Sequence, residues 1–210
     1  MHLTLKKNTY NIQKLLFDGL ELNQGIEKQL FSAADKLRAN AKLKATEYVT
    51  PVLGIIFIKY ISDRFDSFTA AVTEGLKGVS KRVNTEKKKK RLYVSKCGFY
   101  LTEKARFSYL YSGAYEKEGK KLREAIIETV EEIEKLKDSF KGILPTTEIQ
   151  KIPDSSLEEL LRIFDAISFQ KDDDVFGRVY EYFLSQFALR EGQKGGQFFT
   201  PLSVVQLIVN

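Results

Sequence analysis

The stretch 52–61, VLGIIFIKYI, constrains the fold of this chain more than any other. Its apolar residues lie on nearly every side of a helix, whereas a helix at a protein surface is apolar along one stripe. Such a helix has to be surrounded by other elements. Thr50 and Pro51 precede it, and proline suits the first position of a helix because it has no N–H to lose there. The sequence therefore predicts a central helix that begins at Thr50–Pro51.

Amphipathic segments on both sides of this stretch supply the elements that would surround it. In the first segment the apolar residues recur at i, i+4, i+7 and i+11, along one stripe of a helix. They are Ile26, Leu30, Ala33 and Leu37. Helical spacing continues in residues 103–111, 122–136, 157–167 and 175–187. The pattern predicts a mainly α-helical domain from residue 26 to residue 189.

Local signals also mark where some of these helices begin and end. Ser156 with Glu159 matches a capping box, in which each side chain bonds to the backbone of the other. Gly142 and Pro145 are expected to end the helix that starts after Gly119. The three acids at 172–174 favour a helix start, because negative charge is stabilised at a helix N-terminus.

Composition excludes several classes of protein. The chain has 210 residues, 43% of them hydrophobic, which is enough to bury a core. No apolar run reaches the ~18 residues of a membrane span, and the N-terminus lacks the apolar core of a signal peptide. The single cysteine, Cys97, cannot form an internal disulfide and suits a reducing compartment. We expect a cytoplasmic protein without a membrane partner.

The positive charge of the chain is concentrated in residues 81–96. The net charge is +6, and this segment alone has eight Lys or Arg against one acid, Glu86. It has no apolar periodicity and follows Gly75 and Gly78, so we expect an exposed loop over residues 75–96. Its cations could contact the phosphates of DNA, or the loop could be solvated surface without a partner. The candidate DNA-binding residues are Lys87, Lys88, Lys89, Lys90 and Arg91.

Aromatic residues accompany this basic segment. Tyr93, Phe99 and Tyr100 could stack on nucleic-acid bases, as aromatic side chains do in many single-strand binders. They also have apolar neighbours, which favours packing in a protein core. We favour the core for these three rings.

Residue types needed for several kinds of chemistry are missing from the sequence. The histidine count is one, at His2, and no cluster of Cys and His suits a metal ion. The acid pairs Glu131–Glu132 and Glu158–Glu159 fall on expected solvent faces of helices. Neither a P-loop nor a G-x-G-x-x-G motif is present. We therefore predict no catalytic residue and no metal ligand in this chain.

The stretch 195–201, GGQFFTP, precedes one further segment with helical spacing. Thr200 can act as N-cap, and Pro201 suits the first helical position. A helix N-terminus with free N–H groups and a hydroxyl can also receive an anionic group, while Phe198 or Phe199 packs against apolar parts of a ligand. The segment is thus either an ordinary helix entrance or part of a ligand site. Because the chain stops soon after this helix begins, we expect residues 1–210 to be the front part of a larger protein.

The residues GQFFTP resemble the signature by which the modification (M) subunits of type I restriction-modification systems, HsdM, enter their catalytic domain. Four upstream segments resemble the same family in the same order: 30–40, 52–65, 99–110 and 175–188. The resemblance implies an N-terminal helical domain that ends at the entry to an α/β methyltransferase domain not contained in the chain. It divides the chain into an extension, 1–25, the helical domain, 26–189, and a linker with the first helix of the methyltransferase domain, 190–210.

The resemblance also implies a function. The family transfers a methyl group from S-adenosyl-L-methionine to adenine N6 in DNA, together with a specificity (S) subunit and a restriction (R) subunit, and its N-terminal domain serves DNA clamping and assembly. By this resemblance the cofactor-binding residues are Gln197, Phe198, Phe199, Thr200, Pro201 and Leu202.

Two motifs of that chemistry are not in the sequence. The family holds the adenine amine with Asn-Pro-Pro-Tyr/Phe, but the four prolines here are never adjacent, and the glycine-rich cofactor loop is also missing. We therefore expect the 210-residue chain alone to be inactive. An alternative is a non-catalytic helical module that binds nucleic acid or protein. The gene sequence after Asn210 would separate the two, since the family requires both motifs there.

Overall fold

The computed structural model describes residues 26–40, 42–77, 85–136, 146–169 and 173–190. Over these residues the secondary structure is helical throughout, without a strand, as predicted. The predicted extension 1–25 and almost all of the segment 190–210 lie outside the described residues.

Helix α3 (Ala45–Ser67) is the long central helix, which confirms the prediction from its apolar character. Its predicted start was wrong, because the helix begins at Ala45 and Pro51 lies inside it. The Glu47 carboxylate accepts the Lys44 N–H at 3.1 Å and so satisfies one free donor at this end. Tyr48 and Val49 are buried in the core. Their burial stabilises the additional turn and offsets the hydrogen bond that Pro51 cannot donate.

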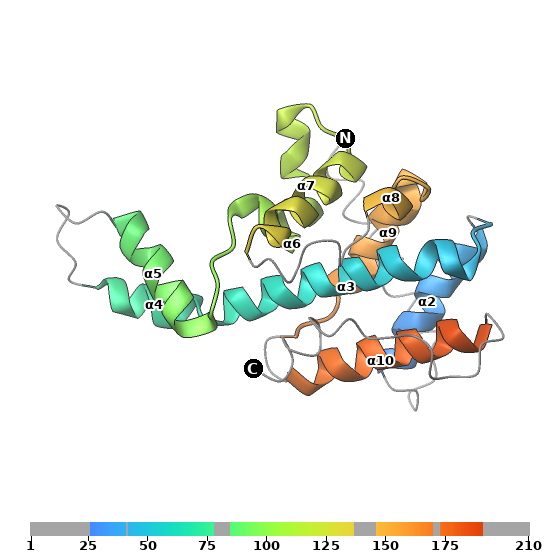
Figure 1. Cartoon of the computed structure of the whole chain (residues 1–210), viewed down its shortest axis with the longest axis horizontal. Helices are drawn as coiled ribbons and strands as arrows, with labels where there is room; N and C mark the ends of the chain where they lie inside the picture. The colour runs from blue at the N-terminus through green and yellow to red at the C-terminus, as the bar shows by residue number, and fades with distance from the viewer. Residues whose placement is uncertain (1–25, 41, 78–84, 137–145, 170–172, 191–210) are drawn as a thin grey trace.

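Helices α2 (Ile26–Asn40) and α10 (Asp173–Arg190) pack together on one side of α3 (Figure 1). The Phe31 ring of α2 meets the rings of Phe183 and Phe187 edge-on, with centroids 5.2 and 5.1 Å apart. Tyr60 of α3 stacks on Phe176 of α10 at 3.9 Å. These ring contacts join the first and last described helices to the central one.

The opposite side of α3 is covered by four shorter helices and two 3-10 turns (Figure 1). In chain order they are η1 (Glu103–Ala105), α6 (Phe107–Tyr111), η2 (Ala114–Glu118), α7 (Leu122–Glu134), α8 (Thr146–Ile149) and α9 (Asp154–Asp165). The predicted helix over 103–111 is thus interrupted at Arg106, which has an extended backbone. The stripe predicted for α7 is confirmed, since Leu122, Ile126, Val130 and Ile133 are all buried.

Two further predicted helix boundaries were also wrong. Helix α9 begins at Asp154 after Pro153, so Ser156 lies inside the helix and does not cap it. The backbone N–H of Ser156 bonds to the Pro153 carbonyl, and Glu159 instead pairs with Arg162 at 3.0 Å. Helix α7 ends at Glu134, well before Gly142.

Polar side chains of α3 hold two neighbouring segments in place. Asp63 accepts the Lys59 ammonium at 2.7 Å, and its second carboxylate oxygen accepts the backbone N–H of Phe169 at 2.9 Å. Both side chains of this ion pair are more than nine-tenths buried. The hydroxyl of Ser62, the residue directly before Asp63, accepts the N–H of Phe107 at 2.7 Å. The start of α6 and the approach to α10 are therefore both tied to the central helix.

Helices α4 (Thr69–Leu76) and α5 (Thr85–Cys97) form a two-helix arm, the name used below for this pair. The arm continues from the C-terminal end of α3 and projects beyond the other helices, at the left of Figure 1. The prediction of an exposed loop over 75–96 was therefore wrong, since residues 75–76 and 85–96 are helical. Lys and Arg are good helix formers, and packing through Leu92 and Tyr93 supplies the apolar contact that the sequence pattern did not reveal.

A candidate nucleic-acid interface on the arm

Helix α5 is held against the rest of the chain by a narrow apolar contact. Tyr93 is 3% exposed and stacks on Phe65 of α3, with ring centroids 3.9 Å apart and planes 14° apart. The Tyr93 hydroxyl lies 3.1 Å from the Thr69 hydroxyl of α4, within hydrogen-bond distance. A Cβ on Gly75 of α4 would lie 3.3 Å from the Leu92 side chain, so glycine permits this close approach.

A glycine ends α5. Gly98 has φ +86°, the left-handed conformation in which helices commonly terminate, and its N–H bonds to the Val94 carbonyl at 3.1 Å. The chain then turns back toward the body through Phe99 and Tyr100. The turn at Gly98 ends the basic helix and lets Phe99 and Tyr100 pack against Phe65.

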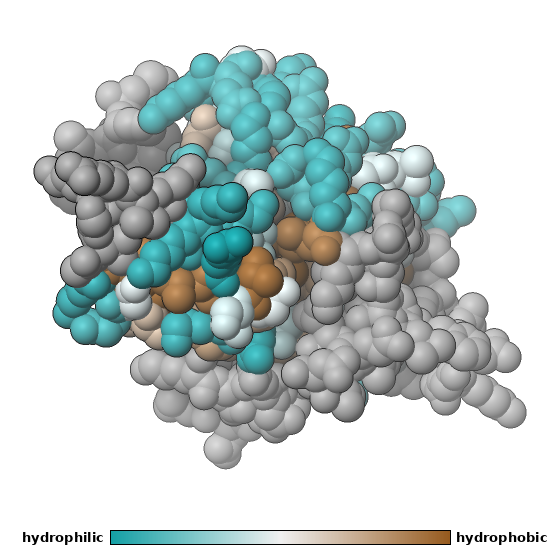
Figure 2. All heavy atoms as spheres, turned by 60° about the vertical axis from the view of Figure 1, so that its left-hand side comes forward, coloured by the Kyte–Doolittle hydropathy of each residue, from teal (hydrophilic) through white to brown (hydrophobic). Residues whose placement is uncertain are grey.

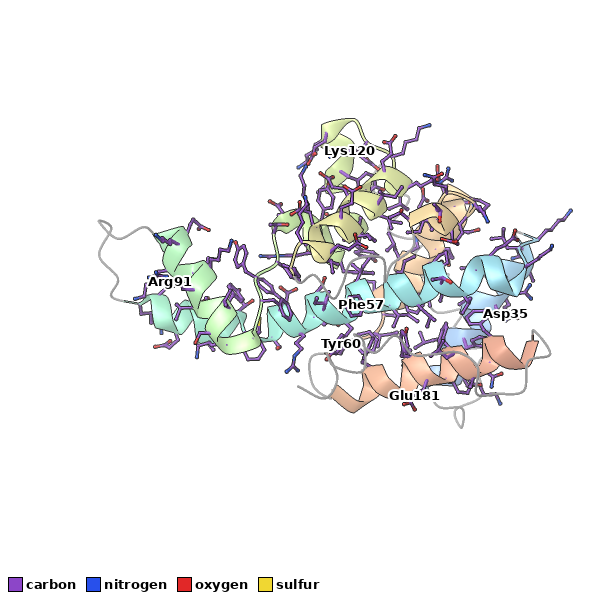
Figure 3. All side chains as sticks on the ribbon, in the orientation of Figure 1. Asp35, Phe57, Tyr60, Arg91, Lys120 and Glu181 are labelled. Atoms are coloured by element: carbon purple, nitrogen blue, oxygen red, sulfur yellow. The ribbon has the colours of Figure 1, made fainter. Side chains whose placement is uncertain are left out.

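The five candidate DNA-binding residues do not share one environment. Lys87, Lys90 and Arg91 are exposed, whereas Lys88 and Lys89 are half-buried. The Lys90 ammonium lies over the Tyr100 ring, 5.7 Å from its centroid. Figure 3 labels Arg91 on the arm, away from the body of the protein. The helix therefore presents an outward basic face. The consecutive cations of the sequence are divided between exposed positions on that face and half-buried positions beside it.

An apolar residue lies on this outward face. Val94 is 46% exposed and follows Lys87 and Arg91 at helical spacing, i, i+4 and i+7. Figure 2, in which the arm comes forward, shows hydrophilic side chains around small apolar areas. The outward face is thus mostly cationic and includes one exposed apolar residue, Val94.

The electrostatics of α5 leave most of its charge uncompensated. The helix has six basic residues and one acid, Glu86. Within the described ranges, Lys88, Lys89, Lys90 and Arg91 make no ion pair with a carboxylate. An elongated surface with several unpaired cations attracts polyanions, and phosphate contacts release counterions from DNA.

A second group of lysines lies in a very different setting on the body. Lys104 and Lys120 each contact both Glu118 and Glu128, with four N–O distances between 2.7 and 2.9 Å. The Tyr109 hydroxyl is 3.3 Å from Glu128. We call Lys104, Lys120, Glu118 and Glu128 the four-charge cluster. Figure 3 shows Lys120 at the top of the body, far from Arg91.

The ion pairs of the four-charge cluster shift the pKa values of its members. Hydrogen bonds from Lys104 and then Lys120 lower the pKa of Glu118 to about 2. The pKa of Glu128 is also lowered, chiefly by the hydrogen bond from Lys120. Hydrogen bonds to Glu118 and Glu128 raise the pKa values of both lysines. All four groups stay charged at neutral pH, and their charges cancel.

The aromatic residues beside the basic segment belong to the protein core, as predicted. Tyr100 meets Phe65 and Tyr93 edge-on, with centroids 5.8 and 5.9 Å apart. Phe99 packs against the same cluster. Since Tyr93 is buried by these contacts, it has no face free to stack on a base.

Sequence reasoning missed the residue that completes this aromatic group. The Arg106 guanidinium carbon lies 4.6 Å from the Phe65 ring centroid, and the same group donates to the Leu101 carbonyl at 3.4 Å. Asp66 is nearby, and burial raises its pKa while Arg106 opposes that rise. Arg106 is separated from Phe65 by more than forty residues in sequence, so no local signal could reveal the contact.

The remaining predictions concern metal ligands, membrane spans, the acid pairs and the cofactor segment. In the part of the chain that the structure describes, no group of three His, Cys, Asp or Glu could hold a metal ion. None of its helices is long and apolar enough to cross a membrane. The acid pairs lie at the surface as expected, with Glu131 and Glu158 exposed and their neighbours half-buried. The predicted cofactor residues, 197–202, lie outside the described residues.

Comparisons with known proteins identify the family to which this chain belongs. Residues 26–164 match the family model of the HsdM N-terminal domain, and residues 171–210 match that of N-6 DNA methylase. The chain therefore belongs to the family of type I restriction-enzyme methylase subunits.

Individual relatives agree with this family. The chain is 34% identical over 205 residues to the type I restriction enzyme MjaIX methylase subunit of Methanocaldococcus jannaschii, covering 92% of the chain and 36% of that protein. It is 25% identical over 215 residues to the MpnII methylase subunit of Mycoplasma pneumoniae, covering 90% and 39%. A match to the HindI methylase subunit of Haemophilus influenzae is 38% identical over 88 residues, 37% of the chain and 20% of that protein. The chain thus spans well under half the length of these relatives.

Proposed function

We propose that this chain is the N-terminal part of a modification subunit that methylates adenine N6 in DNA with S-adenosyl-L-methionine as donor. The observation that carries the proposal is the succession of two family matches, the HsdM N-terminal domain and then N-6 DNA methylase, in the order expected for such a subunit. A specificity subunit, a restriction subunit and duplex DNA are the partners that this function requires. The proposed location is the cytoplasm.

Within this function, the arm is proposed to contact the phosphate backbone of DNA. The exposed side chains of Lys90 and Arg91 support this role, because they are not neutralised by a described carboxylate. Such contacts give affinity that is insensitive to sequence and falls with salt. Target recognition would then belong to the specificity subunit.

The direct test is methyl transfer by the full-length subunit. The protein is combined with its specificity subunit, duplex DNA and S-adenosyl-L-methionine carrying a radioactive methyl group, and the modified nucleoside is identified by mass. We expect N6-methyladenine. Label in cytosine, or no transfer by the folded complex, would contradict the proposed function.

The proposed cofactor segment has its own test in the full-length protein. Thr200→Val removes a hydroxyl and keeps the shape of the side chain. If Thr200 donates to an anionic group of the cofactor, loss of a charge-assisted hydrogen bond costs about 1.5–3 kcal/mol, roughly tenfold or more in affinity. Calorimetric titration of S-adenosyl-L-methionine, corrected for the folded fraction by circular dichroism, measures the change.

A helix cap would behave differently from a cofactor ligand. Loss of a Thr200 cap alone costs ~0.5–2 kcal/mol of stability and leaves cofactor affinity per folded molecule unchanged. Phe198→Ala and Phe199→Ala are companion variants, since a ring that faces the cofactor affects binding beyond its effect on folding. If all three variants bind like the parent after correction, the assignment of residues 197–202 to the cofactor is wrong.

A further inference from the structure

The arm is attached to the body through a small area. Its substantial contacts are between α4 and α5 and between each of these helices and α3. Beyond α3, the rings at 99 and 100 and the residue Arg106 complete the attachment. Because so few contacts join the arm to the body, a specific interaction is needed to fix the orientation of the arm.

That interaction is a stack of three groups from three parts of the chain. Phe65 comes from the end of α3 and is fully buried, Tyr93 comes from α5, and Arg106 comes from the residues just before α6. The Tyr93 ring lies parallel to the Phe65 ring at 3.9 Å, and the Arg106 guanidinium carbon lies 4.6 Å from the centroid of the same ring. A tilt of α5 away from the end of α3 has to separate Tyr93 from Phe65.

The Arg106 side chain is better explained by the ring than by hydrogen bonds. Its Nε is shielded from solvent and has no hydrogen-bond partner among the described residues, and its bond to the Leu101 carbonyl is long, at 3.4 Å. Attraction between a cation and an aromatic face needs no hydrogen-bond acceptor, so the guanidinium is stabilised where it lies. Tyr100, edge-on to both rings, closes the side of the stack.

We propose that the Tyr93–Phe65–Arg106 stack is the joint that orients the arm, and that Tyr93 and Arg106 are positioning residues for its contact with DNA. The second half of this statement rests on the proposed function of α5. Neither residue touches the phosphates. Both act by keeping the cations of α5 in the one direction in which they meet the duplex together.

The physical consequence is a change in affinity without a change in charge contacts. When the joint is weakened, the arm spends less time in the direction that binds DNA. The apparent affinity for DNA falls in proportion to the fraction of molecules in that direction. Arg106 is half-buried, and losing its cation–π contact shifts such an equilibrium by about two- to fivefold, which sets the largest fall in affinity. The number of phosphates neutralised in the complex is unchanged, so the dependence of affinity on salt keeps its slope.

The test compares Arg106→Gln with Arg106→Lys, which keeps a cation over the ring. Tyr93→Phe, which keeps the stack and loses the hydroxyl, is a second conservative variant. The direction of the arm is measured as the distance distribution between spin labels at Ser95 of α5 and Ser155 of α9, both exposed. Cys97→Ser removes the competing thiol and keeps a donor for the Phe99 carbonyl, which Cys97 now serves at 3.1 Å. DNA binding is measured on unlabelled chains against one duplex over a series of salt concentrations.

We expect Arg106→Gln to broaden the distance distribution and to weaken DNA binding by up to about two- to fivefold at an unchanged salt slope. Arg106→Lys and Tyr93→Phe should stay near the parent in both measurements. A distribution as narrow as that of the parent would overturn the joint. A reduced salt slope would also overturn it, because Arg106 would then be a phosphate contact itself.

A failure of the proposed function has a different signature. If Lys90→Gln with Arg91→Gln leaves DNA binding unchanged, α5 is not the DNA contact, and the positioning role is overturned with it. The distance measurement then still reports whether the stack orients the arm. If those lysine and arginine changes weaken binding but Arg106→Gln broadens the distribution without weakening it, the positioning role alone is wrong.

Discussion

Lysines occur both on the basic face of α5 and in the four-charge cluster on the body, but only those in the cluster are paired with carboxylates. Lys104 and Lys120 lie 2.7–2.9 Å from two glutamates, and their charge is cancelled where it arises. Lys90 and Arg91 on α5 have no such partner among the described residues. A count of lysines therefore does not locate a binding surface. What distinguishes the two regions is whether tertiary structure supplies a carboxylate within reach.

The difference also separates two uses of charge. Ion pairs in the four-charge cluster join η1, η2 and α7, so they contribute to the stability of that part of the fold. On α5, Lys88, Lys89, Lys90 and Arg91 make no ion pair with a described carboxylate, so their positive charge remains available for a partner. Mutations in the first region should change stability, and mutations in the second should change DNA binding.

The largest expected effect is on DNA binding by α5. Changing Lys87, Lys88, Lys89 and Lys90 together to Gln should weaken binding of any duplex. The slope of log affinity against log salt should fall by up to ~0.9 for each phosphate contact that is lost. Fluorescence anisotropy with a labelled duplex at several salt concentrations measures both quantities.

A matched pair of double variants tests whether the position of the charge matters. Lys90→Gln with Arg91→Gln and Lys104→Gln with Lys120→Gln each remove two positive charges. We expect the first pair to reduce the salt slope and the second to leave it unchanged. Equal slopes in the two pairs would show that net charge alone governs binding and that α5 has no special role.

A smaller effect is expected on stability in the four-charge cluster. Glu128→Gln removes the carboxylate that both lysines share and leaves them facing each other. Because these groups are partly solvated, the free energy of unfolding should fall by no more than about 1 kcal/mol. Urea denaturation followed by circular dichroism measures it, and DNA affinity should stay at the parent value. Glu131→Gln on the same helix is the control, since Glu131 is exposed and makes no ion pair in the described structure.

The smallest expected effect is a pH dependence. The pKa of Glu118 is lowered from its ordinary value of 4.5 to about 2 in the folded chain. Its contribution to stability is therefore present above pH 4.5 and is lost as the pH falls toward about 2, because the unfolded chain binds the proton first. Glu118→Gln should flatten the fall in melting temperature over that range, while Glu116→Gln in the same 3-10 helix should not. Parallel curves for the parent and Glu118→Gln would contradict the assignment.

The central helix was predictable from sequence because it is apolar on nearly every side, a property of the residues themselves. Its start was not, since Thr50–Pro51 is a good local start signal. Burial of Tyr48 and Val49 in the core outweighs that signal and extends the helix to Ala45. Ser156 failed as a cap for a related reason, because the chain enters α9 at Pro153 and buries Ser156 in the helix.

Helix α5 is the element that local sequence patterns predicted least well. Its lysines suggested a loop because they show no apolar stripe, yet Tyr93 stacked on Phe65 and Leu92 packed against the core hold the helix in place. The candidate residues Lys87 to Arg91 were found by composition. Their division into exposed and half-buried positions depends on which side of the helix faces α4.

The sequence by itself determined the family, the helical class and the central place of α3, because these follow from residue types and spacings along the chain. The predicted cofactor segment, Gln197–Leu202, also comes from sequence and stays a prediction. Only the tertiary structure decided which cations are neutralised and which ring holds the arm. Charges and rings interact over a few ångströms in space, and the partners of Lys104 and Phe65 come from separate parts of the chain.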